Sequence, residues 1–344
     1  MNFHDHAEAQ AQACAALGSV FTARLLSLAA RRLKKSGAVA ARLFNWSQTR
    51  MQADAVALRL AGALHHLVLT DAAPALAEAY RDPPECDARL WEVIEASLQE
   101  HEATVLAMLD SAPQTNEVAR SAILIAAAHW LTARYELPLV LSELGASAGL
   151  NLLWDHYALV AGAKRFGPTN PVLTLAPEWR GPLPPSGRPV IHARAGVDLN
   201  PLDPITDRQR MLAYIWADQY QRQQRCSMAL DLAARLRPEI SQGSAIDWLE
   251  QRLNKPQKHS LHLIYHTVVW QYLSPTDQAR GKALLTRAGA RADRTAPLAH
   301  LAMEGDGKAP GAGLRLHLWP DDLAIDLGRT DYHGRWVDWH VPAA

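Results

Sequence analysis

The sequence predicts an α/β protein in which an all-helical N-terminal region, residues 1–135, precedes a sheet-containing domain, residues 136–344. In the first region apolar residues recur at steps of three and four, as in Leu60, Leu64 and Leu67, which places them on one helix face. In the second region short apolar runs alternate with helical stretches. This alternation is typical of a sheet wrapped by helices.

Local patterns predict the individual elements of the second region. Pro- and Gly-rich segments at 162–188, including FGPTNP and RGPLPPSG, predict an extended insertion. The C-terminal runs LRLHLWP, LAIDLG and WVDWHV, separated by turn residues, predict antiparallel strands. The apolar runs predicted as strands are 139–144, 189–194, 261–266 and 314–319. The predicted helices are 150–161, 208–236 and 276–288.

Composition excludes several classes of protein. Hydrophobic residues make up 49%, which is typical of a globular protein. Lys+Arg and Asp+Glu both total 35, and this balance argues against a nucleic-acid-binding protein. The three cysteines form no CxxC pair, there is no signal-peptide pattern, and the longest nearly uncharged helical run, Ser121–Ala133, is too short to span a bilayer. We therefore expect a cytoplasmic protein without a membrane segment, and the sequence does not predict its oligomeric state.

The most informative segment is an apolar strand that runs into a small-residue loop, LVLSELGASAGLN at 139–151. A P-loop requires a Lys that does not follow Gly149, and Ser147 replaces the second glycine of the dinucleotide fingerprint. An acidic residue followed by G-x-x-x-G fits the loop of methyltransferases, which packs against the methionine part of S-adenosylmethionine, with Glu143 close to its ammonium group. The alternative is a tight turn without a ligand. The candidate cofactor-binding residues here are Glu143, Gly145, Ser147, Gly149 and Asn151.

The next two predicted strands end on polar residues that fit the same cofactor. Asp198 closes the run ARAGVD, where its carboxylate can accept both ribose hydroxyls. This requires 162–188 to be an insertion, and the alternative is an ordinary turn carboxylate. In the segment ISQGSAIDWL, Ser244 and Ala245 stand where methyltransferases place the residues that meet the adenine edge. A hydroxyl at that position contacts adenine more weakly than a carboxylate does.

His266 ends the fourth predicted strand and is the candidate general base. Ligands of open α/β sheets sit outside the carboxyl ends of the strands, so a near-neutral imidazole there would face the acceptor. The alternative is a core histidine bonded to backbone. We predict no metal site, because His262 and His266 share a strand face without a Cys or second carboxylate at ligand spacing.

Several motifs together resemble a bacterial family known as domain of unknown function 2332, over nearly the full length. The resemblance implies a methyltransferase-like, Rossmann-like sheet and draws attention to Asn116, Glu117 and Arg120 as a polar group that opens a helix. The chain departs from the family pattern at Ser244, where Asp is expected, and at Val197, where Cys is common. The segments that carry the resemblance are LRLAGALHHLVL (58–69), PQTNEVARS (113–121), LGASAGLNL (144–152), HTVVWQYL (266–273) and YHG (332–334).

These observations lead to one hypothesis and one alternative. The hypothesis is an S-adenosylmethionine-dependent methyltransferase that acts on a small molecule. Its cofactor would bind at the glycine loop, and the acceptor pocket would be shaped by the residues Asn116, Glu117, Arg120 and His266. The alternative is a non-catalytic ligand-binding or regulatory module on the same fold.

Overall fold

The computed structural model describes residues 1–341, and the chain forms two compact units. The first consists of Met1–Thr115 together with Thr206–Ser227, and the second of Asn116–Ile205 together with Met228–Ala344. The expected boundary at residue 135 is therefore not where the compact units divide. A segment from the second half of the sequence returns to complete the first unit.

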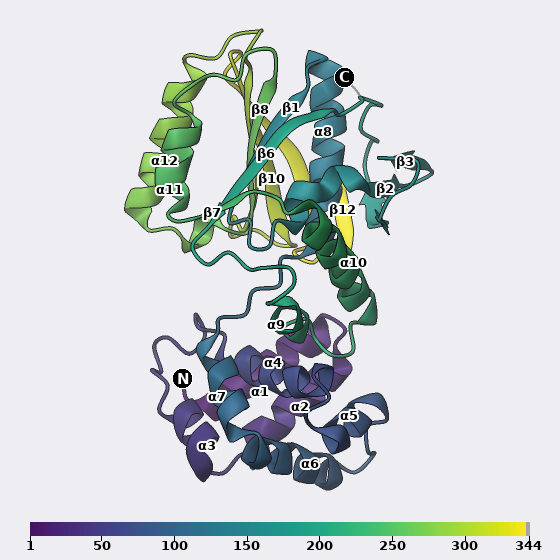
Figure 1. Ribbon diagram of the computed structural model, residues 1–344, viewed down its shortest axis with the longest axis vertical. Helices are drawn as coiled ribbons and strands as arrows, with labels where there is room; N and C mark the ends of the chain where they lie inside the picture. Colours follow the sequence, from purple (N-terminus) through teal and green to yellow (C-terminus); the bar gives the residue numbers. More distant parts are fainter. Residues whose placement is uncertain (342–344) are drawn as a thin grey trace. The chain divides into compact units, whose positions relative to one another are not determined.

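The first unit is helical, as the three- and four-residue spacing of its apolar positions predicts (Figure 1). Leu60 and Leu64 of α4 are fully buried in its core. The Tyr214 ring packs directly on Gly62 of α4, where a Cβ added to the glycine would lie 2.5 Å from the ring. The hydrogen of the Tyr214 hydroxyl is shared between the carbonyls of Met108 and Ser111, at 3.1 and 2.8 Å. The helices of this unit are α1 (Phe3–Ala16), α2 (Val20–Arg32), α3 (Gly37–Phe44), α4 (Val56–Leu69), α5 (Pro74–Arg81), α6 (Asp87–Glu100), α7 (Glu102–Asp110), α9 (Arg208–Ala213) and the start of α10 (Tyr220–Leu236).

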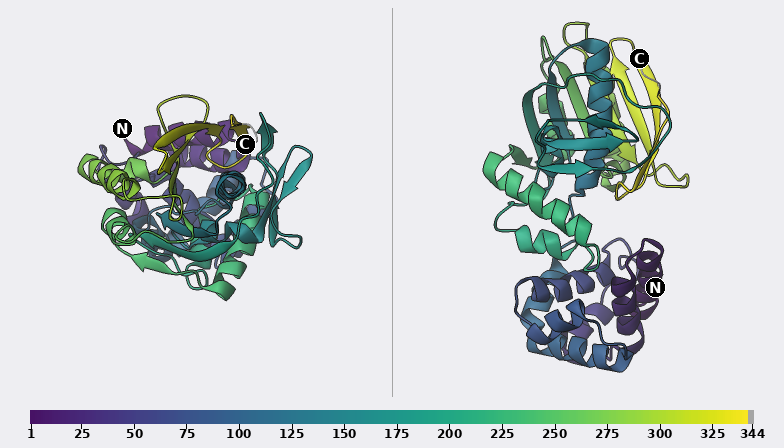
Figure 2. Two further views of the ribbon diagram at one scale, coloured as in Figure 1. Left: turned by 90° about the horizontal axis from the view of Figure 1, so that it is seen from above. Right: turned by 90° about the vertical axis from the view of Figure 1, so that its right-hand side faces the viewer.

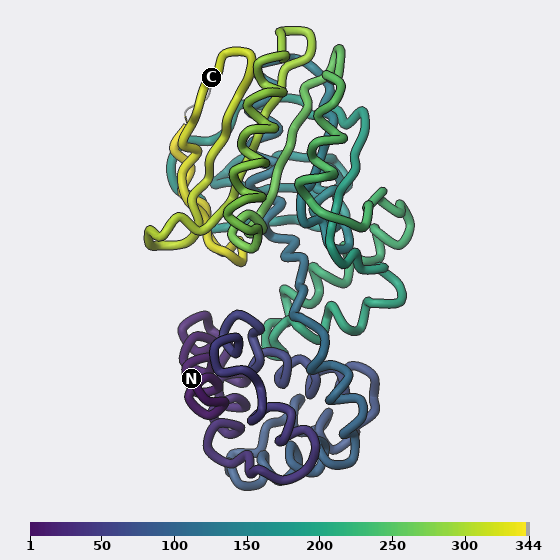
Figure 3. Tube along the Cα trace, turned by 90° about the vertical axis from the view of Figure 1, so that its left-hand side faces the viewer, coloured from purple at the N-terminus to yellow at the C-terminus, as the bar shows by residue number. Residues whose placement is uncertain are grey.

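The second unit contains a large mixed sheet in the order β5-β12-β11-β10-β9-β8-β1-β6-β7. Its strands are β1 (Leu139–Leu144), β5 (Glu178–Arg180), β6 (Ile191–Asp198), β7 (Ile240–Gln242), β8 (Leu261–Thr267), β9 (Leu298–Glu304), β10 (Ala312–Trp319), β11 (Leu323–Thr330) and β12 (Trp336–Trp339). The run β7-β6-β1-β8-β9 is parallel throughout, and numbered along the chain its order is 3-2-1-4-5. Strands β9 to β12 pair antiparallel, which confirms the C-terminal prediction (Figure 3).

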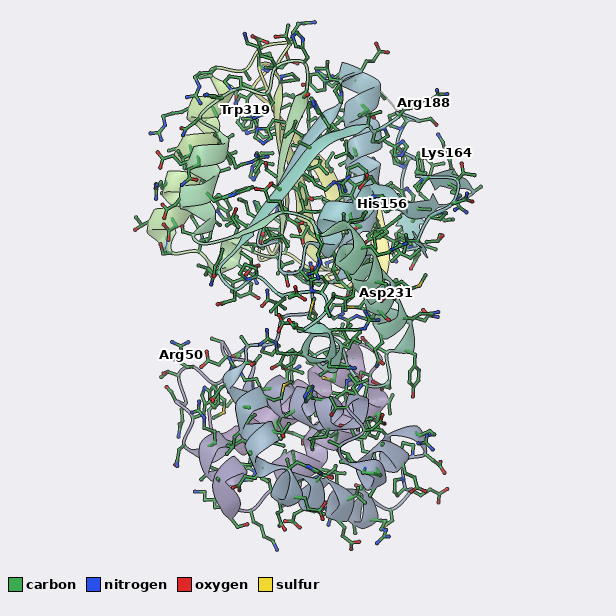
Figure 4. All side chains as sticks on the ribbon, viewed as in Figure 1. Arg50, His156, Lys164, Arg188, Asp231 and Trp319 are labelled. Carbon is green, nitrogen blue, oxygen red and sulfur yellow. The ribbon has the colours of Figure 1, made fainter. Side chains whose placement is uncertain are left out.

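Helices cover both faces of this sheet (Figures 1 and 2). On one face α11 (Ala245–Arg252) and α12 (Pro275–Gly289) pack on a buried apolar cluster that includes Ile264 of β8. Trp319 of β10 lies against Gly289 at the end of α12 (Figure 4). On the other face lies α8 (Ser121–Tyr135), which is preceded by a short 3-10 helix, η1 (Val118–Arg120), and is buried over most of its length, as its apolar sequence predicts.

The connection from β1 to β6 differs from the prediction. A helix over 150–161 is wrong, because the chain forms a kinked 3-10 helix, η2 (Leu150–His156), and then strand β2 (Tyr157–Ala161). The expected insertion at 162–188 contains β3 (Lys164–Phe166) and β4 (Leu173–Leu175), which flank β2 in a small separate sheet, and also β5. The predicted helix 208–236 is interrupted between α9 and α10, whereas 276–288 is confirmed as α12.

Candidate functional site

The candidate site lies where β1 runs into the glycine loop, residues 145–149, at the carboxyl edge of the parallel strands. The Gly145 amide donates to the Val197 carbonyl of β6 at 2.8 Å. Gly145 and Gly149 have φ angles of 72° and 73°, and Ser147 between them has φ 54°. Glycine adopts this left-handed backbone without strain, whereas serine does not. The loop is therefore a sharp turn whose shape depends on its glycines.

Asp198, the last residue of β6, is bonded directly to this loop. One carboxylate oxygen accepts the Ser147 amide at 2.8 Å, and the other accepts the Asn200 amide at 2.9 Å. The Asp198 carbonyl accepts the Gly243 amide at 2.9 Å, which ties it to the end of β7. A carboxylate has about four acceptor positions, so these two bonds leave room for hydroxyl donors. The residues predicted to hold the cofactor on β1 and β6 thus share one edge of the sheet.

Packing within the protein also requires both glycines. A Cβ on Gly149 would lie 2.8 Å from Pro238 Cγ and 2.9 Å from Ile240 Cδ1. A Cβ on Gly145 would overlap the two methyl groups of Val269, which follows β8. The turn therefore needs glycine even without a ligand, and this supports the alternative interpretation of the loop.

Glu143 is enclosed in the protein and does not present a charge to the loop. Its side chain is 1% exposed, and its nearest donor is the Tyr265 hydroxyl at 3.5 Å. Burial raises the pKa of Glu143 well above its ordinary value, and the Tyr265 hydroxyl offsets only part of that effect. The single hydrogen of the Tyr265 hydroxyl is shared with the Asn151 carbonyl, which lies nearer, at 3.1 Å. The expected contact between Glu143 and a ligand ammonium group therefore does not fit its surroundings.

Asn116, Glu117 and Asn151 join the start of α8 to the glycine loop. The Asn116 side chain accepts the Leu150 amide at 3.1 Å, directly after the loop. The buried Asn151 amide group donates to the Glu117 carbonyl at 3.3 Å, and the Ser121 hydroxyl donates to Asn151 Oδ1 at 2.7 Å. The Glu117 carboxylate accepts the amide two residues later at 3.2 Å. These contacts anchor the loop, which gives a structural role to the polar residues that open the helix.

Arg120 lies at the same edge of the sheet, beside the end of β8. Its guanidinium donates to the Thr267 carbonyl at 2.8 Å and to the Tyr332 carbonyl at 3.0 Å. Thr267 directly follows His266, so the Arg120 cation contacts the backbone of the residue after the predicted base, at the end of β8. The segment YHG at 332–334, which the sequence singled out, is thus joined to this edge through Arg120.

Ser244 and Ala245 occupy the beginning of α11. Ser244 is the N-cap of that helix, and its hydroxyl accepts the Asp247 amide at 3.3 Å. The preceding Gly243 is bonded to Asp198, which places both residues next to the end of β6. Ser244 therefore has a capping role that accounts for its hydroxyl.

His266 forms a buried polar cluster with two residues that the sequence analysis missed. Its Nδ1 lies 2.6 Å from Glu304 Oε1, and its Nε2 lies 3.0 Å from His300 Nε2. The ring stacks on Trp270 with centroids 4.9 Å apart. Glu304 and His300 belong to β9, a strand that the sequence analysis did not predict. Recognising LAHLAME at 298–304 as a strand would have placed both next to β8.

The His266 ring and the residues around Glu143 lie on opposite faces of the sheet. Side chains alternate along a strand, so His266 shares the α11–α12 face with Ile264, while Tyr265 points to the α8 face. Glu143 is paired with Tyr265 in register and bonded to it. The structure therefore does not place the His266 ring beside residues 116–120 on a common face, as one acceptor pocket would require. They meet only at the edge, through Arg120.

Residues 145–149, Gly-Ala-Ser-Ala-Gly, also match the G-x-S-x-G pattern of a nucleophile elbow. In such elbows a serine with strained backbone sits between a strand and a helix. Ser147 has this strained backbone and follows β1, the middle strand of the parallel run. However, its side chain is nearly buried, at 4% exposure, and the segment that follows is a short 3-10 helix.

Within residues 1–341 there is no group of three or more His, Cys, Asp or Glu side chains arranged to hold a metal ion. No helix in this described range combines the length and apolar character needed to cross a bilayer.

Comparison with known proteins identifies a family that spans almost the whole chain. Residues 4–339 match the family model described as "Uncharacterized protein conserved in bacteria (DUF2332)". No curated protein and no solved structure matches the chain.

Proposed function

Because the chain belongs to this uncharacterized bacterial family, its activity must be argued from its own site, and we propose that it is an S-adenosylmethionine-dependent methyltransferase acting on a small molecule. The proposal extends to the fold: we assign the parallel part of the sheet to the Rossmann-like, methyltransferase type. The order 3-2-1-4-5 of β7-β6-β1-β8-β9 is that of doubly wound nucleotide-binding sheets.

The bond between Asp198 and the glycine loop is the observation on which this proposal chiefly rests. In doubly wound sheets ligands bind outside the carboxyl ends of the strands, where the strand order reverses. The reversal here lies at β1, and the glycine loop follows β1 directly. The Ser147–Asp198 bond places a carboxylate within 2.8 Å of that loop's backbone. A nucleoside with a charged tail needs both features, a hydroxyl acceptor and a close backbone.

Each group of residues at this edge would contact a different part of the cofactor. Asp198 would accept the ribose hydroxyls on the acceptor positions that its two backbone bonds leave. The backbone of 145–149 would meet the methionine part, and Ser244 with Ala245 would border the adenine because the preceding Gly243 is bonded to Asp198. When bound, S-adenosylmethionine supplies the methyl group. Glu143 would support the site without touching the cofactor, by holding Tyr265, which in turn holds Asn151.

Two of the residues predicted to shape the acceptor pocket lie at the end of β8: Arg120 at the edge of the sheet, and His266 with its ring on the α11–α12 face. Methyl transfer depends mainly on alignment of the acceptor, and a base is needed only when the acceptor carries a proton. His266 is the residue we assign to that proton. Arg120 would draw an anionic or carbonyl-bearing acceptor to the end of β8.

A non-catalytic ligand-binding module is the alternative, and specific contacts favour it. The Ser244 hydroxyl is already used as the N-cap of α11, and both ring nitrogens of the predicted base His266 are engaged by Glu304 and His300. Such a module would bind the ligand without converting it. Incubation with S-adenosylmethionine and a bacterial small-molecule extract separates the two, because only the enzyme would form the demethylated product.

Isothermal titration calorimetry with S-adenosylmethionine and its demethylated product tests the cofactor site. We expect Asp198→Asn to weaken binding about tenfold or more, because a hydrogen bond to a charged group is worth roughly 1.5–3 kcal/mol. Asp338→Asn is the matched control, since this half-exposed aspartate lies on β12, far along the sheet from β6, and its carboxylate pairs with His340; binding should be unchanged. Absence of binding to the wild-type protein at millimolar ligand would overturn the proposal.

A serine hydrolase is a second candidate, favoured by the G-x-S-x-G sequence and the strained Ser147 backbone. It predicts covalent labelling of Ser147 by a fluorophosphonate probe, with the modified peptide found by mass spectrometry. Ser147→Ala should abolish the labelling. The methyltransferase proposal expects no labelling at this residue in either protein.

A further inference from the structure

Glu304, at the end of β9, concentrates several contacts on one carboxylate oxygen. Its Oε1 accepts from His266 Nδ1 at 2.6 Å, from the Val269 amide at 2.8 Å and from the Trp270 amide at 3.0 Å. Burial alone would raise the pKa of Glu304, but the bonds from His266 and the two amides outweigh it and lower the pKa. Glu304 is therefore held as a carboxylate that only accepts hydrogen bonds.

This arrangement determines which nitrogen of His266 carries the proton. Because a carboxylate offers no hydrogen, the His266 Nδ1 must donate to Glu304. Burial first, and then His266 and His317, lower the pKa of His300 well below its ordinary value, so His300 is neutral. In the tautomer with its proton on Nδ1, the Nε2 of His266 has a lone pair that accepts from His300 Nε2, 3.0 Å away. The nitrogen of His266 that can take up a proton is therefore Nε2, where His300 is its partner in this structure.

The same oxygen holds a strained segment against the glycine loop. Val268 has φ 60°, a left-handed backbone that is a genuine outlier for a β-branched residue. Strain of this kind persists only where surrounding contacts determine it. Glu304 binds the next two amides, the Val269 side chain lies on Gly145, and the Trp270 ring stacks on His266. Loss of the Glu304 acceptor would let residues 268–270 relax away.

We propose that Glu304 is the positioning residue of this site, fixing the tautomer of His266 and holding residues 268–270 over the glycine loop through the same oxygen. This inference rests on the proposed function, because the His266 tautomer matters for a base and the position of residues 268–270 matters for a bound cofactor. The other oxygen, Oε2, is buried without a hydrogen-bond partner among the described residues. Such an unsatisfied group is costly, and its retention fits a functional more than a purely structural role.

Histidine side-chain NMR on protein labelled with 15N-histidine tests the first effect. We expect the wild-type His266 signal, assigned by its loss in His266→Gln, to show a proton on Nδ1. Glu304→Ala should shift it to the Nε2-protonated form, and Glu304→Gln, whose carbonyl can still accept, should restore Nδ1. A wild-type protein with its proton on Nε2 would overturn the proposal, and this measurement needs no variant at Glu304 to fold.

Calorimetric titration of the same proteins with the demethylated product of S-adenosylmethionine tests the second effect. If Glu304→Ala leaves residues 268–270 in place in only a tenth of molecules, affinity falls about tenfold. Glu304→Gln should stay within about threefold, and Glu250→Ala, an exposed glutamate on α11 that pairs with Arg280, should bind like wild type.

The two measurements separate this inference from the proposed function. A tautomer shift in Glu304→Ala without any binding to the wild-type protein supports the positioning of His266 and overturns the methyltransferase proposal. Binding that is equal in the wild type and Glu304→Ala, together with an unchanged tautomer, overturns the inference and leaves the cofactor site standing.

Discussion

Substitution of Gly145 by alanine tests whether Val269 covers the glycine loop. Gly145 has φ 72°, and left-handed backbone costs a residue with a Cβ roughly 1–2 kcal/mol. The added Cβ would also overlap both methyl groups of Val269, and overpacking of this kind costs roughly 1–3 kcal/mol. We therefore expect Gly145→Ala to lower the free energy of unfolding by roughly 2–5 kcal/mol.

Two further variants separate the strain from the overlap. Gly307 has nearly the same φ, 74°, but a Cβ there would meet nothing within 4 Å, so Gly307→Ala should cost only the strain. Adding Val269→Ala to Gly145→Ala removes the overlapping methyl groups, and the pair should show a favourable coupling of about 1–3 kcal/mol. Scanning calorimetry can follow the second unit if the two units unfold separately. Equal costs for Gly145→Ala and Gly307→Ala, or no coupling, would refute the contact with Val269.

Two other predictions concern buried polar groups. Burial, helped by Arg252, lowers the pKa of His262 to about 3 in the folded protein, against 6.5 for the free side chain. Below pH 6.5 the unfolded chain takes up a proton that the folded protein does not, so the free energy of unfolding falls toward pH 3 by at most roughly 5 kcal/mol. His262→Gln should reduce this pH dependence. An identical acid profile of both proteins in urea titrations would contradict the prediction. In the first unit the Asp218 carboxylate accepts the Ser19 hydroxyl and the Phe21 amide at the start of α2. Asp218→Ala should therefore cost roughly 2–3 kcal/mol in chemical denaturation, and a cost near zero would show that this cap is dispensable.

The parallel strands could be predicted where their sequence is mostly apolar. Strands β1 and β8 are buried on both faces and their runs contain few polar residues, which is why 139–144 and 261–266 agree with the structure. Strand β9 was missed because LAHLAME contains two alanines and a histidine, which interrupt the β-branched or aromatic pattern typical of strands. Residues 150–161 were misassigned because the backbone bends at Leu153, whose φ of −104° is not helical.

Part of the candidate site could also be predicted from local sequence, and part could not. The position of Asp198 at the end of a strand follows from local sequence, and its bond to Ser147 agrees with that position. The partner of His266 could not be found, because Glu304 lies 38 residues away and belongs to a strand that was not recognised. The burial of Glu143 was also hidden, since a residue at a strand end gives no sign of which face its side chain will take.

The helical unit cannot be cut from this protein as one continuous piece. Tyr214 comes from the returning segment 206–227, fills the space beside Gly62 and bonds the end of α7. A fragment that ends at residue 115 or 135 would lack Tyr214 and the rest of 206–227, and the apolar surface of α4 beside Gly62 would be exposed to water. A grafted or recombined version of this unit would have to carry both stretches, joined by a new linker, to remain folded.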